Sequence, residues 1–595
     1  MNKSDTNNSG SDDQSDGNAQ QTVGANFQFS LPPQLDAAVK NNLDEWTSAN
    51  KVARLWERDS SVWTGADEAN WLGWLNIVER QQADETVFTA LAEDVKKAGF
   101  EHALLLGMGG SSLCPEVFAI TFGKQAGFPQ LHIVDSTDPA QVAAAEKAVD
   151  LAKTVCIVAS KSGSTLEPNI LKQYFFARMK KAVGKENAGK HFIAITDPGS
   201  KMEQVAKADG FRRIFYGDPQ IGGRYSALSK FGMVPAAAMG MDVKRFLAHA
   251  KSAADAAKSG DVAANPGVHL GLILGTAHNA GQNKITFFTS PEIYDLGAWM
   301  EQLIAESTGK QGKGITPVDR EHMASAGHYG ADRIFAYIRL VGGDNAVMDD
   351  GIAALKAAGQ PVVQFDIADI YQIGGLFFTW EIATAVAGSI MGINPFNQPD
   401  VEASKIETRH LTEEYEKTGK LTEHSPIFEG DGVKLFADEK YAAVLQGTSG
   451  SIPSLKAALQ AHLDQIKPGD YFASLAYLQM TDAHEEVIQG FRHKVRDAKK
   501  VATCLGFGPR FLHSTGQDYK GGPNTGVFLQ LTADHPADLA IPGQRYTFGV
   551  VIAAQAAGDL AVLQQRGRRA LRVHLGADVD ASLRKLSSTI SEVLD

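Results

Sequence analysis

The sequence is short of cysteine and of clustered positive charge. Its 595 residues include three cysteines, Cys114, Cys156 and Cys504, whose spacing fits neither a disulfide framework nor a zinc site. A reducing, cytoplasmic location is therefore expected. The net charge is -12, and Lys and Arg are not concentrated into a basic surface. This distribution argues against nucleic acid or an acidic membrane surface as a partner.

Long apolar runs are missing too. No run approaches the roughly 20 residues of a membrane-spanning helix, and the N-terminus lacks the basic and apolar regions of a signal peptide. We therefore expect no membrane partner. Residues 1–26 are rich in Asn, Ser, Asp and Gly and cannot bury enough apolar surface to order themselves. A disordered tail is expected over this stretch.

The rest of the sequence has the composition of a soluble enzyme, with 44% hydrophobic and 21% charged residues. A chain of this length is expected to fold as more than one domain. Short apolar runs alternate with stretches of helical spacing, which predicts an α/β fold with doubly wound parallel sheets. The strand-like runs of a first series are 102–109, 131–135, 154–160, 191–196 and 212–217, and those of a second are 284–290, 333–340 and 361–367.

A third series of strand-like runs begins after a charged, irregular stretch near 407–440. We expect a first domain over 27–275, a second over 276–410 and a further α/β block over 411–595. The pattern leaves open whether this block is an independent domain or completes the second sheet. In doubly wound sheets ligands bind beyond the carboxyl ends of the strands, so the segments that follow strands are the first places to look for function.

One such segment is rich in hydroxyls. The run SKSGSTLEP (160–168) follows an apolar strand and leads into a helix. A phosphate there would meet hydroxyls, backbone N–H groups and the positive end of the helix, although the run is not the GxxxxGK[ST] nucleotide loop. The alternative is a turn whose hydroxyls only cap the helix. The candidate phosphate ligands are Ser160, Lys161, Ser162, Ser164 and Thr165.

The segment GMGGSSL (107–113) also follows a strand and precedes a helix. Its glycines let the backbone approach a ligand closely, and Ser111 and Ser112 can donate hydrogen bonds to it. A rival interpretation is dinucleotide binding, because the next strand ends in Asp135. Against that interpretation, Ser112 occupies the third glycine position of GxGxxG and the acid comes late.

Glu306 is the candidate general base. It stands in the last turn of a helix with an apolar stripe, and Gly309 is a natural C-cap. The negative end of the helix dipole and partial burial would raise its pKa, which suits a base that takes a proton and returns it. Gln302 lies one turn earlier on the same face and could hold phosphate or substrate. The alternative is a solvated glutamate at a helix end.

Two cations complete the set of candidates. Arg224, in GGRYS (222–226), keeps its charge at every relevant pH and can stabilise an enediolate, or it could pair with a loop carboxylate such as Asp218. Lys405 ends INPFNQPDVEASK (393–405). Its ammonium could interact with the ring oxygen or phosphate of a sugar, or could be solvated.

The segments GMGGSSL, SKSGSTLEP, GGRYS, ESTGK and INPFNQPDVEASK occur in the order found in glucose-6-phosphate isomerases, and the chain resembles that family. The first two lie in what looks like a sugar-isomerase (SIS) domain. The resemblance covers roughly 70–410 and extends toward the C-terminus, and it is closest to the isomerase portion of bifunctional transaldolase/glucose-6-phosphate isomerases. It implies two SIS-type three-layer α/β/α domains with a further α/β block.

The resemblance also implies a function, the reversible interconversion of glucose 6-phosphate and fructose 6-phosphate without a metal or other cofactor. Glu306 would move the proton between C2 and C1, Arg224 would stabilise the cis-enediolate, and Lys405 would assist ring opening. Gly110, Ser111, Gly223 and Gln302 would line the pocket. Two other functions stay open, namely a non-catalytic SIS protein that senses a sugar phosphate and an isomerase that also acts on mannose 6-phosphate. Whether the chain is a homodimer or a monomer is open as well.

One departure concerns the ring-opening histidine. The family carries it in a GQH segment after the catalytic glutamate, and that segment is not recognisable here. The run HSTGQDYKGGPNTG (513–526) resembles it in composition, so His513 is expected as the ring-opening acid and base. His322 and His328, closer behind Glu306 in sequence, are the competitors. A lone histidine near glycines can also simply hydrogen-bond within its loop.

Overall fold

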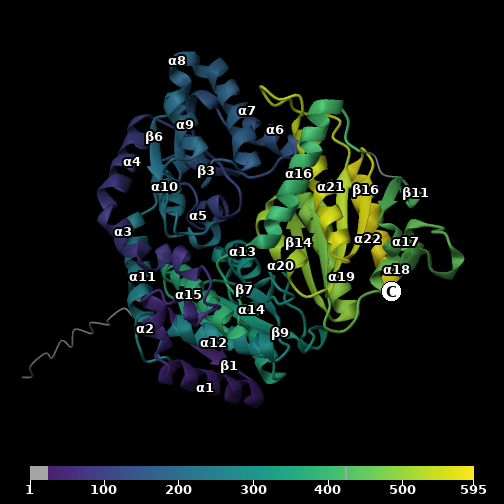
Figure 1. The fold of residues 1–595 in the computed structure, drawn as a ribbon, viewed down its shortest axis with the longest axis horizontal. Coiled ribbons are helices and arrows are strands. Elements are labelled where there is room, and N and C mark those ends of the chain that lie inside the picture. Colours follow the sequence, from purple (N-terminus) through teal and green to yellow (C-terminus); the bar gives the residue numbers. More distant parts are fainter. Residues whose placement is uncertain (1–24, 423–424) are drawn as a thin grey trace, which may run out of the picture.

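The computed structural model describes residues 25–422 and 425–595, and its strands form three separate sheets (Figure 1). Of the tail predicted over 1–26, positions 1–24 lie outside the described residues. Most neighbouring strands are parallel and are joined through helices, so the α/β fold expected from the alternating pattern is confirmed.

The first sheet is wholly parallel, and its strands lie in the order β3-β2-β4-β5-β6. Its central strand buries all six residues of TVCIVA, as a strand covered on both faces should. The strands are β2 (His102–Leu106), β3 (Gln130–Val134), β4 (Thr154–Ala159), β5 (Phe192–Thr196) and β6 (Arg213–Tyr216). We call this sheet, together with the helices that follow, the first lobe. Its helices are α3 (Ile77–Ala83), α4 (Glu85–Lys97), α5 (Leu113–Phe122), α6 (Pro139–Lys147), α7 (Leu166–Val183), α8 (Lys185–Ala188), α9 (Lys201–Ala208) and α10 (Lys230–Ala238).

The second sheet has the order β1-β10-β9-β7-β8 and is parallel except at its edge strand β1. The strands are β1 (Asn26–Ser30), β7 (Lys284–Thr289), β8 (Thr316–Val318), β9 (Arg333–Leu340) and β10 (Val362–Ile367). The helices of this second lobe are α1 (Pro33–Ser48), α2 (Lys51–Trp56), α11 (Val243–Ala256), α12 (Pro266–Asn279), α13 (Leu296–Thr308), α14 (Ala346–Ala357) and α15 (Ile373–Met391).

The domain predicted over 27–275 does not coincide with one sheet. Residues 26–30 at its start pair antiparallel with β10 of the second sheet. Helices α11 and α12 at its end pack against α15 of the second lobe. From β1 onward the described chain therefore starts in the second lobe, crosses to the first and returns, and no local pattern of apolar residues predicts this path.

The third sheet, within the described residues of the block predicted over 411–595, pairs with neither of the others. Its order is β11-β12-β16-β15-β13-β14, with β11 and β12 antiparallel at one edge. The strands are β11 (Phe428–Gly430), β12 (Val433–Phe436), β13 (Tyr471–Tyr477), β14 (Ala502–Phe507), β15 (Gly526–Ala533) and β16 (Arg569–Leu575). The helices of this C-terminal block are α17 (Glu439–Gln446), α18 (Leu455–Leu463), α19 (Asp482–Lys499), α20 (Gly516–Gly521), α21 (Phe548–Gln565) and α22 (Val579–Leu594).

The three sheets share one winding pattern. In each, the first four parallel strands of the unit lie in the spatial order second, first, third, fourth: β3-β2-β4-β5, β8-β7-β9-β10 and β14-β13-β15-β16. The connection reverses direction between the first and third strands, and ligands of doubly wound sheets bind at the carboxyl edge near that point.

Helix α16 (Pro399–Thr418) joins the second lobe to the C-terminal block. It packs on α20 and α21 of the block and stands beside the first lobe (Figure 1). Ile541, Phe548 and Val551 of the block are part of a core cluster with residues of the first lobe. These contacts place the carboxyl edge of the first sheet against the C-terminal block.

Two helices are long and apolar enough to cross a membrane, contrary to the expectation that no run approaches that length. They are Ile370–Met391, which contains α15, and Phe548–Gln565, which is α21. Buried residues make up 78% and 67% of their apolar windows. Core helices of soluble proteins pass the same test, so this composition is weak support for a membrane span.

Candidate active site

The hydroxyl-rich loop lies between β4 and α7, at the carboxyl edge of the first sheet. Asn169 holds it in place, because its Nδ2 donates to Gly163 O at 3.1 Å and to Thr165 O at 2.7 Å. Gly163 has a φ of +66°, and a Cβ there would lie 2.4 Å from the backbone nitrogen of Met202. Glycine is therefore required at the point where the loop turns.

Three hydroxyls of this loop face a cavity of about 620 Å³. Ser162, Ser164 and Thr165 line it, and the Oγ atoms of the two serines lie 2.8 Å apart. Thr165 is the N-cap of α7, yet its side chain caps no described backbone N–H. The loop thus offers hydroxyls and the positive end of a long helix to the same space, which is an arrangement suited to a phosphate.

The two other candidates of this loop do not line the cavity. Lys161 turns to Asp197, with 2.5 Å between Nζ and Oδ2. Ser160 is buried, and its Oγ has no partner among the described residues. Burial raises the pKa of Asp197 although Lys161 opposes that effect. Lys161 therefore contributes charge from behind the loop.

His513 and Lys405 line the same cavity from the opposite side. His513 ends the 3-10 turn η11 (Arg510–His513) of the C-terminal block, and its Nε2 lies 3.0 Å from Oε1 of Glu167 in the first turn of α7. Lys405 lies on α16, with its Nζ 2.8 Å from Glu402 Oε1. The cavity is therefore walled by the first lobe on one side and by α16 and the block on the other.

Glu167 keeps His513 in place from the first lobe. Burial would raise the pKa of this carboxyl, but His513 and, more weakly, Lys405 outweigh burial, so the pKa is lowered. Gln555 of α21 donates its Nε2 to the same carboxylate oxygen at 2.7 Å, and Thr137 donates to Gln555 Oε1 at 2.6 Å. The carboxylate is thus fixed and ionised beside the imidazole.

Glu306 and Arg224 form a buried pair, and neither of them lines the 620 Å³ cavity. Glu306 is 8% exposed and Arg224 1% exposed, so the solvated helix-end alternative for Glu306 is wrong. Arg224 Nη1 lies 3.5 Å from Glu306 Oε1, and no described residue donates to Glu306 Oε2. A buried carboxylate oxygen without a donor is available to accept a proton from a bound molecule.

Arg224 is held rigidly by groups other than Asp218, which pairs with Arg80 instead. Its Nε donates to Ser307 Oγ at 2.7 Å, next to the base. Its Nη atoms donate to Gln398 Oε1 at 2.9 Å and to the carbonyls of Pro395 and Asn397 at 2.7 and 3.1 Å. The guanidinium is therefore a fixed positive charge beside Glu306.

Gln302 connects the buried pair to the histidine. It lies one turn before Glu306 on α13, and its Nε2 donates to the backbone oxygen of His513 at 2.7 Å. Its Oε1 is buried without a partner in the described chain. Because α13 carries both Gln302 and Glu306, the base and the histidine are positioned by one helix.

The glycine segments bring the loops into contact. Gly110 and Ser111 belong to the 3-10 turn η3 (Gly109–Ser111) after β2, and Gly223 and Arg224 to η6 (Gly223–Tyr225). A Cβ on Gly110 would lie 2.1 Å from the carbonyl oxygen of Gly223. Only glycine allows this close approach, which packs Arg224 against the edge of the site.

The dinucleotide interpretation of GMGGSSL is not supported. Asp135, the acid that would bind a ribose, accepts a hydrogen bond from Ser112 Oγ at 2.9 Å and one from Arg510 Nη2 at 2.9 Å. Asp135 is also buried. The acid is thus engaged within the protein.

The competing histidines lie elsewhere. The ring centroid of His322 lies 4.4 Å from that of His493 on α19, with the rings tilted by 34°, and His328 Nδ1 lies 2.8 Å from Ser325 Oγ. Neither lines the 620 Å³ cavity, whereas His513 does. Of the three histidines, the structure brings His513 together with the hydroxyl loop.

Sequence reasoning missed several residues of this site. Glu167 stands inside SKSGSTLEP, and Lys310 stands inside ESTGK, so both motifs carried a signal for them. Lys310 is buried and donates to Asn394 O at 2.9 Å and to Asn397 Oδ1 at 3.0 Å, in the loop that also binds Arg224. Burial lowers the pKa of Lys310 well below its ordinary value. Gln398 likewise stands inside INPFNQPDVEASK, whereas Gln555 lies in no motif that the sequence analysis singled out.

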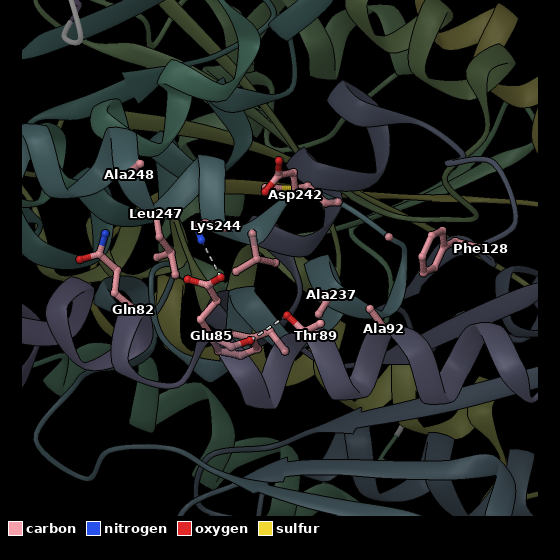
Figure 2. A pocket seen from close by; sticks show the side chains of 14 residues that line it. Gln82, Glu85, Thr89, Ala92, Phe128, Ala237, Asp242, Lys244, Leu247 and Ala248 are labelled. Atoms are coloured by element: carbon pink, nitrogen blue, oxygen red, sulfur yellow. Dashed lines mark hydrogen bonds and ion pairs between the residues drawn. The ribbon is translucent and has the colours of Figure 1, made fainter.

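A second cavity, of about 500 Å³, lies between α4 and the start of α11 (Figure 2). Apolar residues make up much of its lining, and two of its charged residues pair with each other, with Lys244 Nζ 3.0 Å from Glu85 Oε1. None of the candidate site residues lines it. It is therefore separate from the site described above.

The chain is similar to known proteins. The family model for phosphoglucose isomerase matches residues 93–362. A probable glucose-6-phosphate isomerase of Methanococcus maripaludis is 28% identical over 351 residues, covering 51% of this chain and 77% of that protein. A glucose-6-phosphate isomerase of Symbiobacterium thermophilum is 27% identical over 437 residues, covering 64% and 95%.

A solved structure shares the fold. A hypothetical protein from Thermus thermophilus has a TM-score of 0.56 and 23% identity, and the match covers 64% of this chain and 99% of that one. The residues matched by the family model include the hydroxyl loop, η6 and α13, which are the segments that hold the candidate phosphate ligands, Arg224 and the candidate base Glu306. Over residues 93–362 the chain is similar to the phosphoglucose isomerase family.

Proposed function

We propose that this chain interconverts glucose 6-phosphate and fructose 6-phosphate by proton transfer between C2 and C1. The observation that carries the proposal is the buried carboxylate of Glu306, which has one oxygen without a described donor and the other 3.5 Å from the fixed guanidinium of Arg224. Relatives that bear the name glucose-6-phosphate isomerase match the chain at 27–29% identity.

The first chemical step is ring opening. The phosphate is held by Ser162, Ser164 and Thr165 at the start of α7. His513 gives a proton to the ring oxygen as the bond to the anomeric carbon breaks, and the anomeric hydroxyl passes its proton to solvent water as the carbonyl forms. The ionised Glu167, 3.0 Å from Nε2, supports the charged imidazole. Lys405 assists from α16.

The second step is isomerisation of the open chain. Glu306 takes the proton from C2 of the aldose, the electrons form a cis-enediolate, the hydroxyl proton moves from O2 to O1, and Glu306 returns its proton to C1 to give the ketose. Arg224 stabilises the negative charge of the enediolate without having to reorganise, because Ser307, Gln398 and two backbone carbonyls already hold its guanidinium. The reverse reaction uses the same groups in the opposite order.

The site is assembled from one chain. The first lobe supplies the phosphate loop and Arg224, the second lobe supplies Glu306, and the C-terminal block supplies His513. We therefore propose that a single chain is catalytically complete, whatever its oligomeric state. The three cysteines are free and buried, which supports the proposed cytoplasmic location.

A non-catalytic sugar-phosphate sensor would need the hydroxyl loop only. It would have no use for a buried carboxylate held next to a buried arginine, since burying such a pair costs desolvation energy that binding of the phosphate does not require. The pair of Glu306 and Arg224 therefore favours the enzyme over the sensor.

The test is fructose 6-phosphate turnover in a glucose 6-phosphate dehydrogenase coupled assay with EDTA. We expect Glu306→Gln to lower kcat by about 10²–10⁴-fold, the usual contribution of a general base. The matched control is Glu85→Gln, which alters a carboxylate of the cavity in Figure 2 and should leave kcat unchanged. Wild-type protein that binds the sugar phosphate without turning it over would overturn the proposal.

A further inference from the structure

Arg510 lies three residues before His513, in the same 3-10 turn, and reaches across to the first lobe. Its Nη1 and Nη2 donate to the two carboxylate oxygens of Glu116 at 2.7 and 2.8 Å, and Nη2 also donates to Asp135 Oδ1 at 2.9 Å. Glu116 lies on α5, and Asp135 follows β3. One guanidinium thus binds two carboxylates from two elements of another lobe.

This ion cluster is largely buried. The side chain of Arg510 is 17% exposed, and those of Glu116 and Asp135 are 12% and 6% exposed. Asp135 is held further by Ser112 Oγ at 2.9 Å, at the end of GMGGSSL. A buried cluster of this kind fixes geometry, because removing one member leaves the others as uncompensated buried charges.

The direction of the His513 side chain depends on the same turn. In a 3-10 helix the side chains at positions i and i+3 point the same way, so Arg510 and His513 both face the first lobe. Phe511 between them points into the block, where its ring lies 5.4 Å from that of Tyr477. A shift of Arg510 would therefore rotate His513 relative to Glu167.

We infer that Arg510 is a positioning residue that aims His513 at the ring oxygen of the substrate, an inference that rests on the proposed function. Its clamp on Glu116 and Asp135 fixes one end of η11. Gln302, which donates to His513 O at 2.7 Å, fixes the other end to the helix of the base. The two contacts set the distance between the ring-opening group and the isomerising group.

The guanidinium is essential to this role. A lysine ammonium carries the same charge but cannot bind one carboxylate through two parallel hydrogen bonds. Arg510→Lys keeps the charge balance of the cluster but removes the two parallel hydrogen bonds that fix the orientation of the side chain. Glu116→Gln keeps the shape of the cluster and removes one charge. Arg569→Lys is the matched control, because Arg569 Nη1 pairs with Asp470 Oδ2 at 2.7 Å within the block, away from η11.

The experiment separates ring opening from isomerisation by using two substrates. Fructose 6-phosphate needs its ring opened. 5-Deoxyfructose 6-phosphate has no 5-hydroxyl to close a ring, so exchange of a C1 proton for deuterium in D₂O reports on Glu306 alone. Both rates are measured for wild type, Arg510→Lys, Glu116→Gln and Arg569→Lys, with thermal unfolding recorded for each.

We expect Arg510→Lys to lose about 10²-fold in kcat/KM on fructose 6-phosphate, the usual cost of a misplacement near 1 Å, and to keep C1 exchange near the wild-type rate. Glu116→Gln should show the same split to a smaller extent, and it carries the test if Arg510→Lys does not fold. Equal losses on both substrates, or no loss on either, would overturn the inference. Wild type that exchanges no C1 proton would instead refute the proposed function.

Discussion

The second lobe and the C-terminal block are wound alike but contribute different chemistry. In each, a helix lies between the first two strands of the shared winding pattern: β7, α13 and β8 in the lobe, and β13, α19 and β14 in the block. Helix α13 is buried at Gln302, Glu306 and Ser307, whereas α19 ends at Lys499, which pairs with Asp464 at the surface. Two helices at the same position in the same topology therefore need not carry the same function. The elements packed around each helix decide whether its side chains can form a site.

The segments after the second strand differ in the same way. After β14, η11 turns His513 and Arg510 toward the first lobe. After β8, Arg320 pairs with Glu485 of the block at 3.1 Å, and the carbonyl of Asp319 accepts from Arg492 at 2.8 Å. The second lobe thus holds the candidate base and contacts that join it to the block, and the block holds the candidate ring-opening histidine.

The strongest way to test this division is to remove the histidine of each segment. His513→Asn should lower turnover of fructose 6-phosphate by about 10²–10⁴-fold, the range for a lost acid and base. His322→Asn, after β8, is the matched change in the second lobe and should leave kcat/KM unaltered. If His322→Asn lost more kcat/KM than His513→Asn, the ring-opening role would belong to the segment after β8, and its assignment to His513 would be wrong.

The most apolar helix of each region buries a carboxyl side chain, so removing each carboxyl in turn extends the comparison of the two regions. Asp559 on α21 pairs with Lys520 at 2.6 Å, and both side chains are almost fully buried. Asp559→Asn should destabilise the protein by about 3–5 kcal/mol, because Lys520 would remain as an unpaired buried charge. Urea unfolding measures the loss. An unchanged midpoint would show that the pair adds nothing to the stability of the block.

Glu167 is the first lobe's contact with the block's histidine, and its effect depends on pH. Its pKa is lower in the folded protein than the ordinary value of 4.5, through His513 and Lys405. Ionised Glu167 therefore adds stability above pH 4.5, and this contribution is lost as the pH falls through the folded value. Glu167→Gln should unfold more easily than wild type at pH 7 and with a smaller difference at acid pH. A pH-independent difference would contradict the ion pair.

The smallest effect is expected at Glu381 on α15, where both carboxylate oxygens are buried without a partner in the described chain. Burial raises the pKa of this carboxyl well above 4.5. Below pH 4.5 the carboxyl is protonated in the folded and in the unfolded protein, so its titration does not change the free energy of unfolding. As the pH rises above 4.5 the carboxyl ionises in the unfolded protein first, and the free energy of unfolding falls. Glu381→Gln should therefore unfold later than wild type at pH 8 and alike at acid pH. Thermal unfolding at the two pH values checks the sign.

Much of the fold follows from local pattern. The strand β4 could be predicted because all six of its residues are apolar enough to be buried on both faces, and α13 because its apolar stripe ends at Gly309. The pairing of β1 with β10 could not, since the five residues of β1 carry no signal for a partner more than three hundred positions away. The separate third sheet was equally beyond local pattern.

The site was accessible where a motif holds its residues together. The loop at 160–165, Arg224 and Glu306 stand in recognisable segments, and their assigned roles stay predictions. The contact of Glu167 with His513 joins two distant segments, and so does the clamp of Arg510 on Glu116. Such pairs depend on how the lobes pack. The closer resemblance to bifunctional transaldolase/glucose-6-phosphate isomerases stays a prediction too.

The central claim is that one chain holds both the base and the ring-opening histidine. It is tested most directly by mixing Glu306→Gln protein with His513→Asn protein and assaying fructose 6-phosphate turnover. If each site is built within one chain, every site in the mixture lacks one group, and the mixture should be as inactive as its components. Recovery of turnover on mixing would show that two chains share a site and would contradict the account.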